Sequence, residues 1–249
     1  MNIENILSKL PDTKGVVVIL SGGMDSTISM RLCVEKYGAE NIRALTFNYG
    51  QKQSIEIDKA IKSTSILGVK HKVFDLTVLG SISKGFSANV DTEINMPTIK
   101  DVLGDPRPKT YVPNRNMILM SIAAAFAEVE GFDTIIMGLQ IHDEYGYHDT
   151  TKRFVDKVND VLSENRIIKI KIIAPFADMS KFDELQVLKA LDGNIDLMRH
   201  TLTCYNPNDW GDSCGKCPSC SERIANFAKA KLVDPIKYSI DIPWGKLHV

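Results

Sequence analysis

Short strand-like runs that alternate with helical patterns occupy the first 200 residues of this chain. The first run, Val16–Leu20, is apolar throughout and rich in β-branched residues, which is typical of a strand buried on both faces. Four further runs have strand character: Ala44–Phe47, Lys72–Leu76, Thr134–Gly138 and Ile170–Ile173. Strands joined through helices form right-handed crossovers, so the pattern predicts an α/β fold with a doubly wound, Rossmann-like parallel sheet.

The helices between these strands are indicated by periodicity and by their end signals. The helix after the second strand is predicted from four side chains that share one face: Ile57, Ala60, Ile61 and Thr64. Gly68 is expected to end it. The segment 116–130 is apolar nearly all round and stops at Gly131, which predicts a buried helix. Ser180 followed by Asp183 is the pattern of a capping box, so a further helix is predicted to begin there.

The stretch 77–110 fits this alternation poorly, because it holds three glycines and three prolines. Such a long connection in a compact domain is often a lid or a disordered segment. The alternation stops near residue 201. We therefore expect an α/β domain over residues 1–200, with a lid-like insertion near 77–110, and a separate C-terminal segment over 201–249.

Composition and charge narrow the class of protein. With 30 basic and 31 acidic residues the formal net charge is −1, so no overall field favours direct contact with nucleic acid or a membrane. No apolar run reaches the roughly 18 residues of a membrane-spanning helix, and the N-terminus lacks the pattern of a secretory signal. Four of the five cysteines fall within residues 204–220, which suits a metal site in a reducing compartment. We expect a cytoplasmic protein.

A glycine-containing loop, Ser21-Gly22-Gly23-Met24-Asp25-Ser26, directly follows the first predicted strand and precedes a helical pattern. Adjacent glycines can expose successive backbone N–H groups, which attract phosphate together with the helix N-terminus and the serine hydroxyls. The carboxylate of Asp25 suits either a helix cap or a magnesium ligand. The fingerprints of P-loop kinases and of nicotinamide-binding proteins are absent from the sequence. An ordinary glycine turn would also fit two adjacent glycines, but the complete pattern disfavours it.

The cysteine cluster has the spacing C-x9-C-x2-C-x2-C and consists of Cys204, Cys214, Cys217 and Cys220. Four thiolates fill a tetrahedral zinc site and leave no open position, which predicts a structural metal. An iron–sulfur cluster is the rival interpretation, since four thiolates can hold one too. Cys33 is expected to be an ordinary packing residue.

The six-residue loop resembles the pyrophosphate loop of the N-type ATP pyrophosphatases (the PP-loop superfamily). The resemblance implies that ATP is cleaved between its α- and β-phosphates and that a substrate oxygen is adenylated. It further implies an ATP site and, with it, Mg²⁺. The expected ATP contacts are Leu20, Ser21, Gly22, Gly23, Met24, Asp25, Ser26, Thr27, Phe47 and Tyr49.

With the cysteine cluster, the chain resembles the 7-cyano-7-deazaguanine synthase family over nearly its whole length. Three segments carry this resemblance: Thr46–Gln51, Tyr111–Asn116 and Thr201–Asn206. It implies that 7-carboxy-7-deazaguanine and ammonia are the small-molecule substrates, that adenylation and ammonia give the amide, and that a second activation gives the nitrile. It also suggests a homodimer.

The same resemblance implies roles for individual residues. Its implied catalytic residues are Ser21, Asp25, Ser26 and Arg115. Its implied substrate-binding residues are Arg115, Asn116, Asp143, Tyr147 and Asp149. Asp143 and Asp149 could accept hydrogen bonds from the N–H groups of the base, or they could equally cap turns.

The segment 143–151 departs from the family pattern. Tyr145 and His148 replace smaller or non-ionisable residues, Thr150 and Thr151 replace Cys-Arg, and Asn114 stands where the family has glycine. These changes leave open a reaction that stops at the amide or uses another amine. The loop and the cysteines would also suit a PP-loop tRNA-modifying enzyme, and the loop alone would suit a non-catalytic nucleotide-binding protein.

Overall fold

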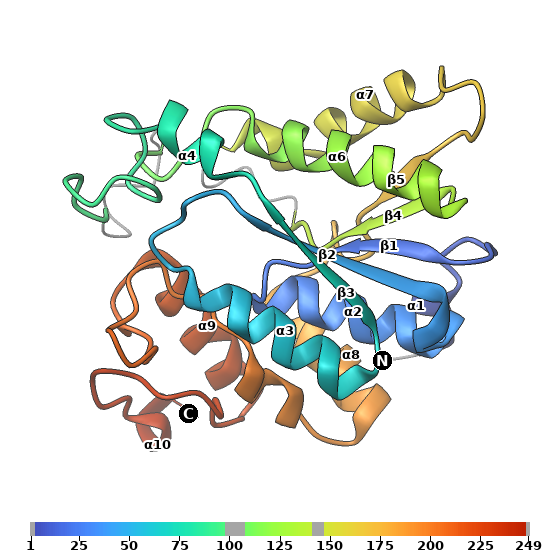
Figure 1. Ribbon diagram of the computed structural model, residues 1–249. Coiled ribbons are helices and arrows are strands. Elements are labelled where there is room, and N and C mark those ends of the chain that lie inside the picture. Colours follow the sequence, from blue (N-terminus) through green and yellow to red (C-terminus); the bar gives the residue numbers. More distant parts are fainter. Residues whose placement is uncertain (1–2, 98–107, 141–146, 248–249) are drawn as a thin grey trace.

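A computed structural model describes residues 3–97, 108–140 and 147–247 (Figure 1). Its sheet has five parallel strands in the order β3-β2-β1-β4-β5, which confirms the predicted doubly wound α/β fold. The strands are β1 (Val16–Ile19), β2 (Ile42–Asn48), β3 (Lys70–Asp75), β4 (Thr134–Met137) and β5 (Lys171–Ile173). Each lies where the sequence predicted a strand.

Helices cover both faces of the sheet. The described helices are α1 (Ile3–Leu7), α2 (Met24–Tyr37), α3 (Ile55–Leu67), α4 (Thr77–Ile82), α6 (Arg115–Glu130), α7 (Lys152–Leu162), α8 (Lys181–Asp192), α9 (Pro218–Lys229) and α10 (Trp244–Leu247), with short 3-10 turns η1 (Ala39–Asn41), η3 (His148–Thr150) and η4 (Asp196–His200). In Figure 1, α6 and α7 lie above the sheet, and α2, α3 and α8 lie below it. No helix within the described ranges is long and apolar enough to cross a membrane.

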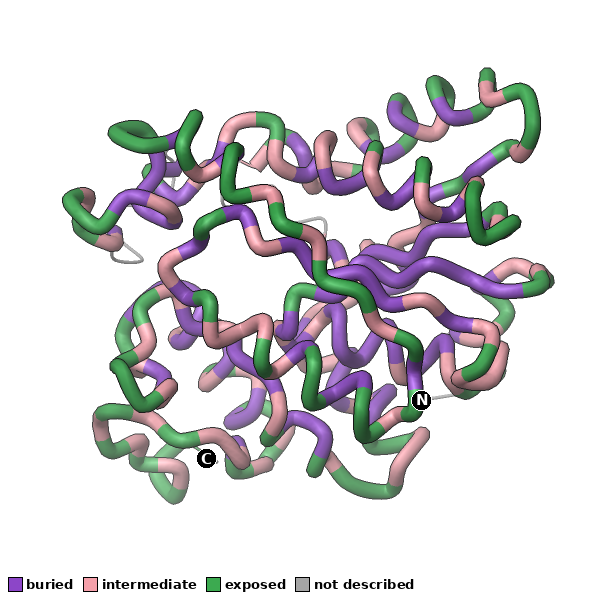
Figure 2. The backbone as a smooth tube through the Cα atoms, viewed as in Figure 1, coloured by how far each residue is buried: buried purple, intermediate pink, exposed green. Residues whose placement is uncertain are grey.

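The strand side chains divide the core into two layers. Val16 and Val18 on β1 join α2 and α8 in one buried cluster, whereas Val17 and Ile19 join α6 and α7 in the other. All four residues of β1 are buried, as are those of β4, so the central strands form the purple centre of Figure 2. This confirms that the continuous apolar runs mark strands buried on both faces.

The predicted helix ends are confirmed more fully than the predicted helix faces. Gly68 and Gly131 adopt the left-handed conformation at the ends of α3 and α6, with φ of 69° and 74°. Ser180 and Asp183 form the predicted capping box of α8. Ala60 and Thr64 are buried on α3, but Ile61 is 47% exposed, so the four residues predicted to share one face are not buried together.

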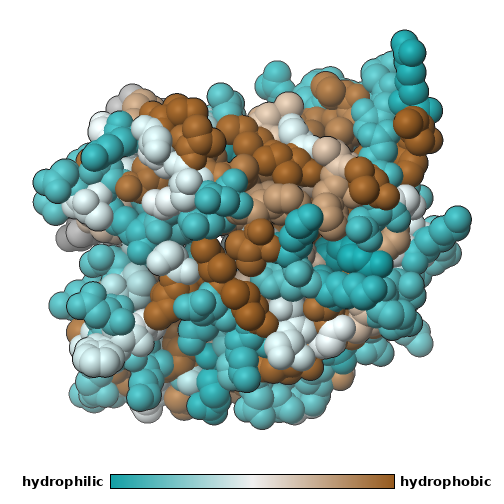
Figure 3. All heavy atoms as spheres, in the orientation of Figure 1, coloured by the Kyte–Doolittle hydropathy of each residue, from teal (hydrophilic) through white to brown (hydrophobic). Residues whose placement is uncertain are grey.

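The physical reason is the small size of the side chains that α3 turns inward. Ser63 is buried beside Ala60 and Thr64, and its hydroxyl donates to the carbonyl oxygen of His200 at 3.1 Å. Figure 3 shows brown patches among teal on the face that carries α3, β3 and α4. The exposed apolar residues of these elements are Ile61, Ile66, Val73, Val78 and Ile82. The prediction that the segment 116–130 forms a buried helix was wrong in part, because α6 buries one face of this segment and leaves Val129 84% exposed.

The stretch 77–110 begins with α4 and continues in turns to residue 97, and residues 98–107 lie outside the described ranges. Several hydrogen bonds attach it to the sheet domain and to itself. Among them, Lys52 N donates to the Asn89 carbonyl oxygen at 2.8 Å, and Asn89 Nδ2 donates to the Thr110 carbonyl oxygen at 2.8 Å. Its role as a lid stays a prediction, as does the domain boundary at residue 200.

Candidate active site and metal centre

A cavity of about 330 Å³ opens at the carboxyl ends of β1, β2 and β4. The strand order reverses between β1 and β4, and ligands of open parallel sheets bind in the crevice at such a point. Its walls come from the loop after β1, from the first turns of α3, α6 and α8, and from the segment 202–222. The C-terminal segment therefore contributes to the same cavity as the predicted phosphate loop.

The phosphate loop is held by its own serines. Ser21 N donates to Ser26 Oγ at 3.2 Å, the two hydroxyls lie 3.0 Å apart, and Gly23 N donates to Ser21 Oγ at 3.2 Å. A Cβ on Gly138, at the end of β4, would lie 2.6 Å from Ser26 Cα and N. The loop and the first turn of α2 therefore pack closely against the end of β4.

Most of the predicted ATP contacts line the cavity. These are Leu20, Ser21, Gly23, Met24, Asp25, Ser26, Phe47 and Tyr49. Gly22 and Thr27 lie outside the lining: the Gly22 carbonyl oxygen accepts from Leu202 N at 2.9 Å, and Thr27 is fully buried behind the loop. Their predicted contact with ATP, like that of the others, stays a prediction.

A buried lysine that the sequence analysis missed lies beside the loop. Lys181 Nζ lies 3.3 Å from Asp25 Oδ2, 3.1 Å from Glu222 Oε2 and 2.9 Å from Gln140 Oε1. Burial opposes the charge of Lys181, but Asp25, Glu222 and Glu184 outweigh burial and raise its pKa above the usual range. A lysine in the first turn of a helix opposes the helix dipole, and this was the one sequence signal that could have marked it.

Two carboxylate oxygens of this cluster have no hydrogen-bond partner among the described residues. They are Asp25 Oδ1 and Glu184 Oε2, both buried. Burial, followed by the charge of Asp25, raises the pKa of Glu184 well above its ordinary value. The N-cap of α2 is Gly23 and makes no side-chain cap bond, so Asp25 pairs with Lys181 and the cap interpretation is wrong.

Arg115 lies at the first turn of α6 and faces the cavity. Its Nη1 donates to the Tyr49 hydroxyl at 3.2 Å, and its guanidinium carbon lies 5.5 Å from the centre of the Tyr49 ring. Asn114, which precedes it, has φ of 53°. Asparagine tolerates this left-handed conformation better than most residues, which explains how it can stand where the family has glycine.

The predicted substrate-binding residues divide into three groups. Arg115, Asn116 and Tyr147 line the cavity, and the Tyr147 hydroxyl hydrogen-bonds Thr110 Oγ1. Asp149 is buried outside the lining, at 2% exposure, and its carbonyl oxygen accepts a long hydrogen bond of 3.4 Å from Asn116 Nδ2. Asp143 lies outside the described residues, as does Tyr145.

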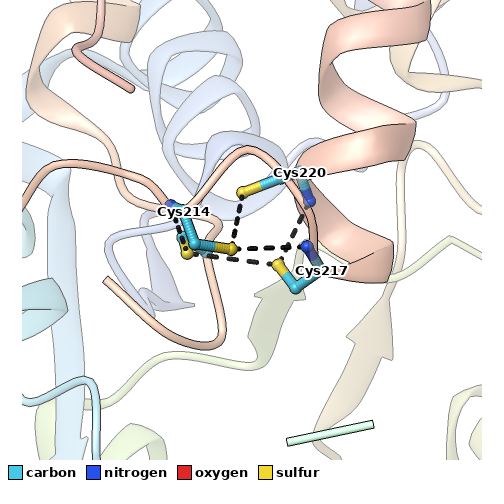
Figure 4. Close-up of side chains that lie close together, drawn as sticks. Cys214, Cys217 and Cys220 are labelled. Carbon is cyan, nitrogen blue, oxygen red and sulfur yellow. Dashed lines mark hydrogen bonds between the residues drawn. The ribbon is translucent and has the colours of Figure 1, made fainter. Parts of the chain in front are cut away.

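The four cysteines converge on one point. Figure 4 shows three of them, Cys214, Cys217 and Cys220, close together. Their sulfur atoms all lie within 4.8 Å of one another, and the Cys214–Cys220 and Cys204–Cys217 pairs are 4.0 Å apart. Four thiolates around one tetrahedral ion at about 2.3 Å would place their sulfurs about 3.8 Å apart. The cluster could therefore hold a metal, as the spacing predicted. Cys33 is fully buried in the core, as expected.

A buried ion pair lies within the cysteine segment, and its arginine also donates to the Met198 carbonyl oxygen, just before that segment, at 3.3 Å. Arg223 on α9 donates to both carboxylate oxygens of Asp234, at 2.6 and 2.9 Å. It also donates to the hydroxyls of Thr201 and Thr203, at 2.8 and 3.0 Å. Those threonines flank Leu202, whose N–H binds the phosphate loop, so Arg223 helps to position one wall of the cavity.

Comparisons with known proteins agree with this architecture. The NMN synthetase of Francisella tularensis is similar in fold, with a TM-score of 0.51 at 17% sequence identity over 93% of this chain and 85% of that one. Two curated relatives are named 7-cyano-7-deazaguanine synthase. The one from Pseudoalteromonas atlantica is 37% identical over 90% of this chain and 98% of its own. The one from Caldicellulosiruptor bescii is 37% identical over 92% and 99%.

The family model described as "Queuosine biosynthesis protein QueC" matches residues 15–231. This match spans the sheet, the phosphate loop and all four cysteines. The chain therefore belongs to the QueC family.

Proposed function

We propose that the protein uses ATP to convert 7-carboxy-7-deazaguanine and ammonia into 7-cyano-7-deazaguanine. The observation that carries this proposal is the convergence of the serine-rich loop, Lys181 and Arg115 on one cavity in a chain of this family. The cavity volume of about 330 Å³ lies within the range of small-molecule sites. The names of the curated relatives support the same substrate and product.

The chemistry requires activation because a carboxylate is a poor electrophile. In the proposed reaction its oxygen attacks the α-phosphorus of ATP and pyrophosphate leaves. Ammonia then adds to the acyl adenylate and AMP departs, which gives the amide. A second ATP adenylates the amide oxygen, and loss of AMP with the two amide protons leaves the nitrile.

The loop and Lys181 suit the first of these steps. Backbone amides with the Ser21 and Ser26 hydroxyls would hold the departing pyrophosphate, and the ammonium of Lys181 would offset its charge. The unpartnered Asp25 Oδ1 fits a hard cation, so Mg²⁺ bound with ATP would reduce the repulsion between phosphates. Arg115 would face the carboxylate of the base.

We further propose that the cysteine cluster holds one structural zinc ion. The 4.0 Å sulfur separations support a single ion, since an iron–sulfur cluster spreads its thiolates over several irons. The segment 201–249 would then be a zinc-bound unit beside an ATP pyrophosphatase-like domain over 1–200. A cytoplasmic location, a homodimer and the lack of direct nucleic-acid contact stay predictions.

The position of His148 does not support the alternative in which the reaction stops at the amide. Its ring packs 5.4 Å from the Tyr111 ring and 6.0 Å from the Phe154 ring, outside the cavity lining. We therefore favour the nitrile.

The test is incubation of the protein with ATP, ammonia and 7-carboxy-7-deazaguanine, followed by mass spectrometry of the base and nucleotide. We expect AMP, pyrophosphate and a base that has lost one water relative to the amide. Lys181→Met should lower turnover by about 100-fold, as loss of a charge-stabilising group commonly does. Lys189→Met, on an exposed position of the same helix, is the matched control. Amide that accumulates while ATP remains would contradict the nitrile product.

A further inference from the structure

The cavity has two chemically different walls. One is apolar and is formed by Ile19, Phe47, Leu119, Met137 and Leu139, which also belong to the core beneath α6. The other is polar and includes Gln53 from the β2–α3 connection, Glu56 from the first turn of α3 and Asn89 from the stretch that follows α4. A flat heterocycle on the apolar wall needs no polar partner there, whereas a ligand on the polar wall must supply hydrogen bonds.

The polar wall presents acceptors that lack donors. Gln53 and Asn89 are 5% and 4% exposed, and the described chain offers no hydrogen-bond partner to Gln53 Oε1 or Asn89 Oδ1. An unsatisfied buried acceptor costs about 1–3 kcal/mol, so such atoms are expected to meet a ligand. The orientation of Asn89 is fixed, because its Nδ2 donates to the Thr110 carbonyl oxygen. Its Oδ1 is therefore the atom that is left to accept a hydrogen bond from a ligand.

Glu56 adds a carboxylate to the same wall, and its orientation is also fixed. Gln51 Nε2 donates to Glu56 Oε1 at 3.0 Å, while Gln51 Oε1 accepts from Tyr49 N at 2.9 Å. The side chain of Gln51, itself held by Tyr49 N, thus fixes the orientation of the Glu56 carboxylate. Glu56 lies next to the phosphate loop, because a Cβ on Gly22 would be 2.1 Å from the Glu56 carbonyl oxygen.

We propose that Glu56, with the side-chain carbonyl oxygens of Gln53 and Asn89, binds the ring N–H and the 2-amino group of a guanine-type base. This inference rests on the proposed function and assigns specificity residues within it. A carboxylate can accept from two adjacent N–H groups of such an edge, as it does from a guanidinium. Adenine offers a single amino group beside ring acceptors, so it fits this acceptor-rich wall poorly and suits the apolar wall instead.

A site built to receive a donor rejects an analogue that lacks it, because its buried acceptors then stay unpaired. The test compares 7-carboxy-7-deazaguanine with the analogue that lacks the 2-amino group. Calorimetry gives the Kd of each base for the wild type and for Glu56→Gln. The Kd of a non-hydrolysable ATP analogue is measured alongside. Asp58→Asn, on an exposed position of the same helix, is the control.

Hydrogen bonds to a charged group are worth about 1.5–3 kcal/mol, so the wild type should prefer the amino-bearing base by about 10-fold to 150-fold. In Glu56→Gln this preference should fall below about 3-fold, with affinity for the ATP analogue unchanged. Gln53→Met, a swap of similar volume, should reduce the preference in the same direction. Asp58→Asn should retain it.

A preference that survives in Glu56→Gln and in Gln53→Met overturns the inference, as does a loss of ATP-analogue binding in place of base binding. Failure of the proposed function is a separate result, because it would appear as absent turnover of 7-carboxy-7-deazaguanine by the wild type. The binding comparison decides the role of Glu56 in either case.

Discussion

Gly22 and Gly23 are adjacent in the phosphate loop, but the structure predicts opposite consequences for the same substitution. In Gly22→Ala the new Cβ would lie 2.1 Å from the Glu56 carbonyl oxygen, on a backbone with φ of +88°. The left-handed conformation costs about 1–2 kcal/mol, and moving α3 away from the loop costs about 1–3 kcal/mol more. We expect a loss of about 2–5 kcal/mol of unfolding free energy.

Gly23→Ala lacks both sources of strain. Its φ is −76°, and the nearest atoms to a new Cβ are Ser21 Oγ at 3.2 Å and the Leu202 carbonyl oxygen at 3.7 Å. An alanine N-cap costs at most about 1 kcal/mol. Because Gly23 lines the cavity, however, its methyl group would obstruct the approach of phosphate to the loop amides. Stability should be nearly retained while ATP affinity falls.

Urea unfolding and calorimetric titration with an ATP analogue separate the two effects. The expected result is a large drop in the unfolding midpoint for Gly22→Ala and a small one for Gly23→Ala, with weakened ATP binding in Gly23→Ala. Wild-type stability in Gly22→Ala would refute the packing of the loop on α3. Wild-type ATP affinity in a folded Gly23→Ala protein would refute the phosphate-loop assignment.

Two further predictions concern Glu56 and the cysteine cluster. Burial raises the pKa of Glu56 to about 7 from an ordinary 4.5, against the opposing hydrogen bond from Gln51 and the charge of Arg115. The native state therefore binds the proton more tightly, and stability is lost as pH rises between these values. Glu56→Gln should remove this pH dependence and be more stable than the wild type at pH 8 by about 1–3 kcal/mol. Urea unfolding at pH 5 and at pH 8 measures the effect. The same change in unfolding free energy between the two pH values in both proteins would contradict the prediction. Cys217→Ser should lower the zinc content from about one per chain and the Tm together, whereas Cys33→Ala should keep its metal.

The elements that could be predicted from the sequence are those that local patterns determine. The five strands, the glycines that end α3 and α6, and the capping box of α8 each depend on a few consecutive residues. The phosphate loop and the cysteine spacing are local too. The position of the phosphate loop at the cavity follows from topology, because parallel strands end at the same edge of the sheet.

The missed residues depend on contacts between distant segments. Lys181 reaches both Asp25 and Glu222 only because α8 packs against α2 and against α9, and no spacing in the sequence relates these residues. The inward face of α3 could not be inferred from its apolar residues for a related reason, because Ile61 is exposed whereas Ser63 is buried. Small polar side chains such as Ser63 are buried when a backbone carbonyl of another element, here that of His200, receives their hydrogen bond. Hydrophobic periodicity does not contain that information.

Substitution of Arg223 tests whether the cysteine segment positions the proposed ATP site. Arg223→Lys keeps the positive charge but replaces the planar guanidinium group, with its five N–H donors, by an ammonium group with three donors at the end of a flexible side chain. It cannot reproduce the bonds to both Asp234 oxygens together with those to Thr201 and Thr203. Loss of at least two charged hydrogen bonds in the interior should cost about 2–4 kcal/mol of unfolding free energy.

The functional consequence of Arg223→Lys should be separable from its effect on the metal. The cysteine sulfurs make no hydrogen bond to Arg223 within the described ranges, so the zinc content should stay at the wild-type level. The segment 201–203 would lose its anchor, and with it the firm hydrogen bond from Leu202 N to the Gly22 carbonyl oxygen. We therefore expect weaker binding of the ATP analogue in a protein that still carries its metal. Normal affinity for the ATP analogue together with reduced stability would show that Arg223 only stabilises the fold. In that case the segment 201–203 would have lost its anchor without any effect on ATP, so it could not be positioning the phosphate loop.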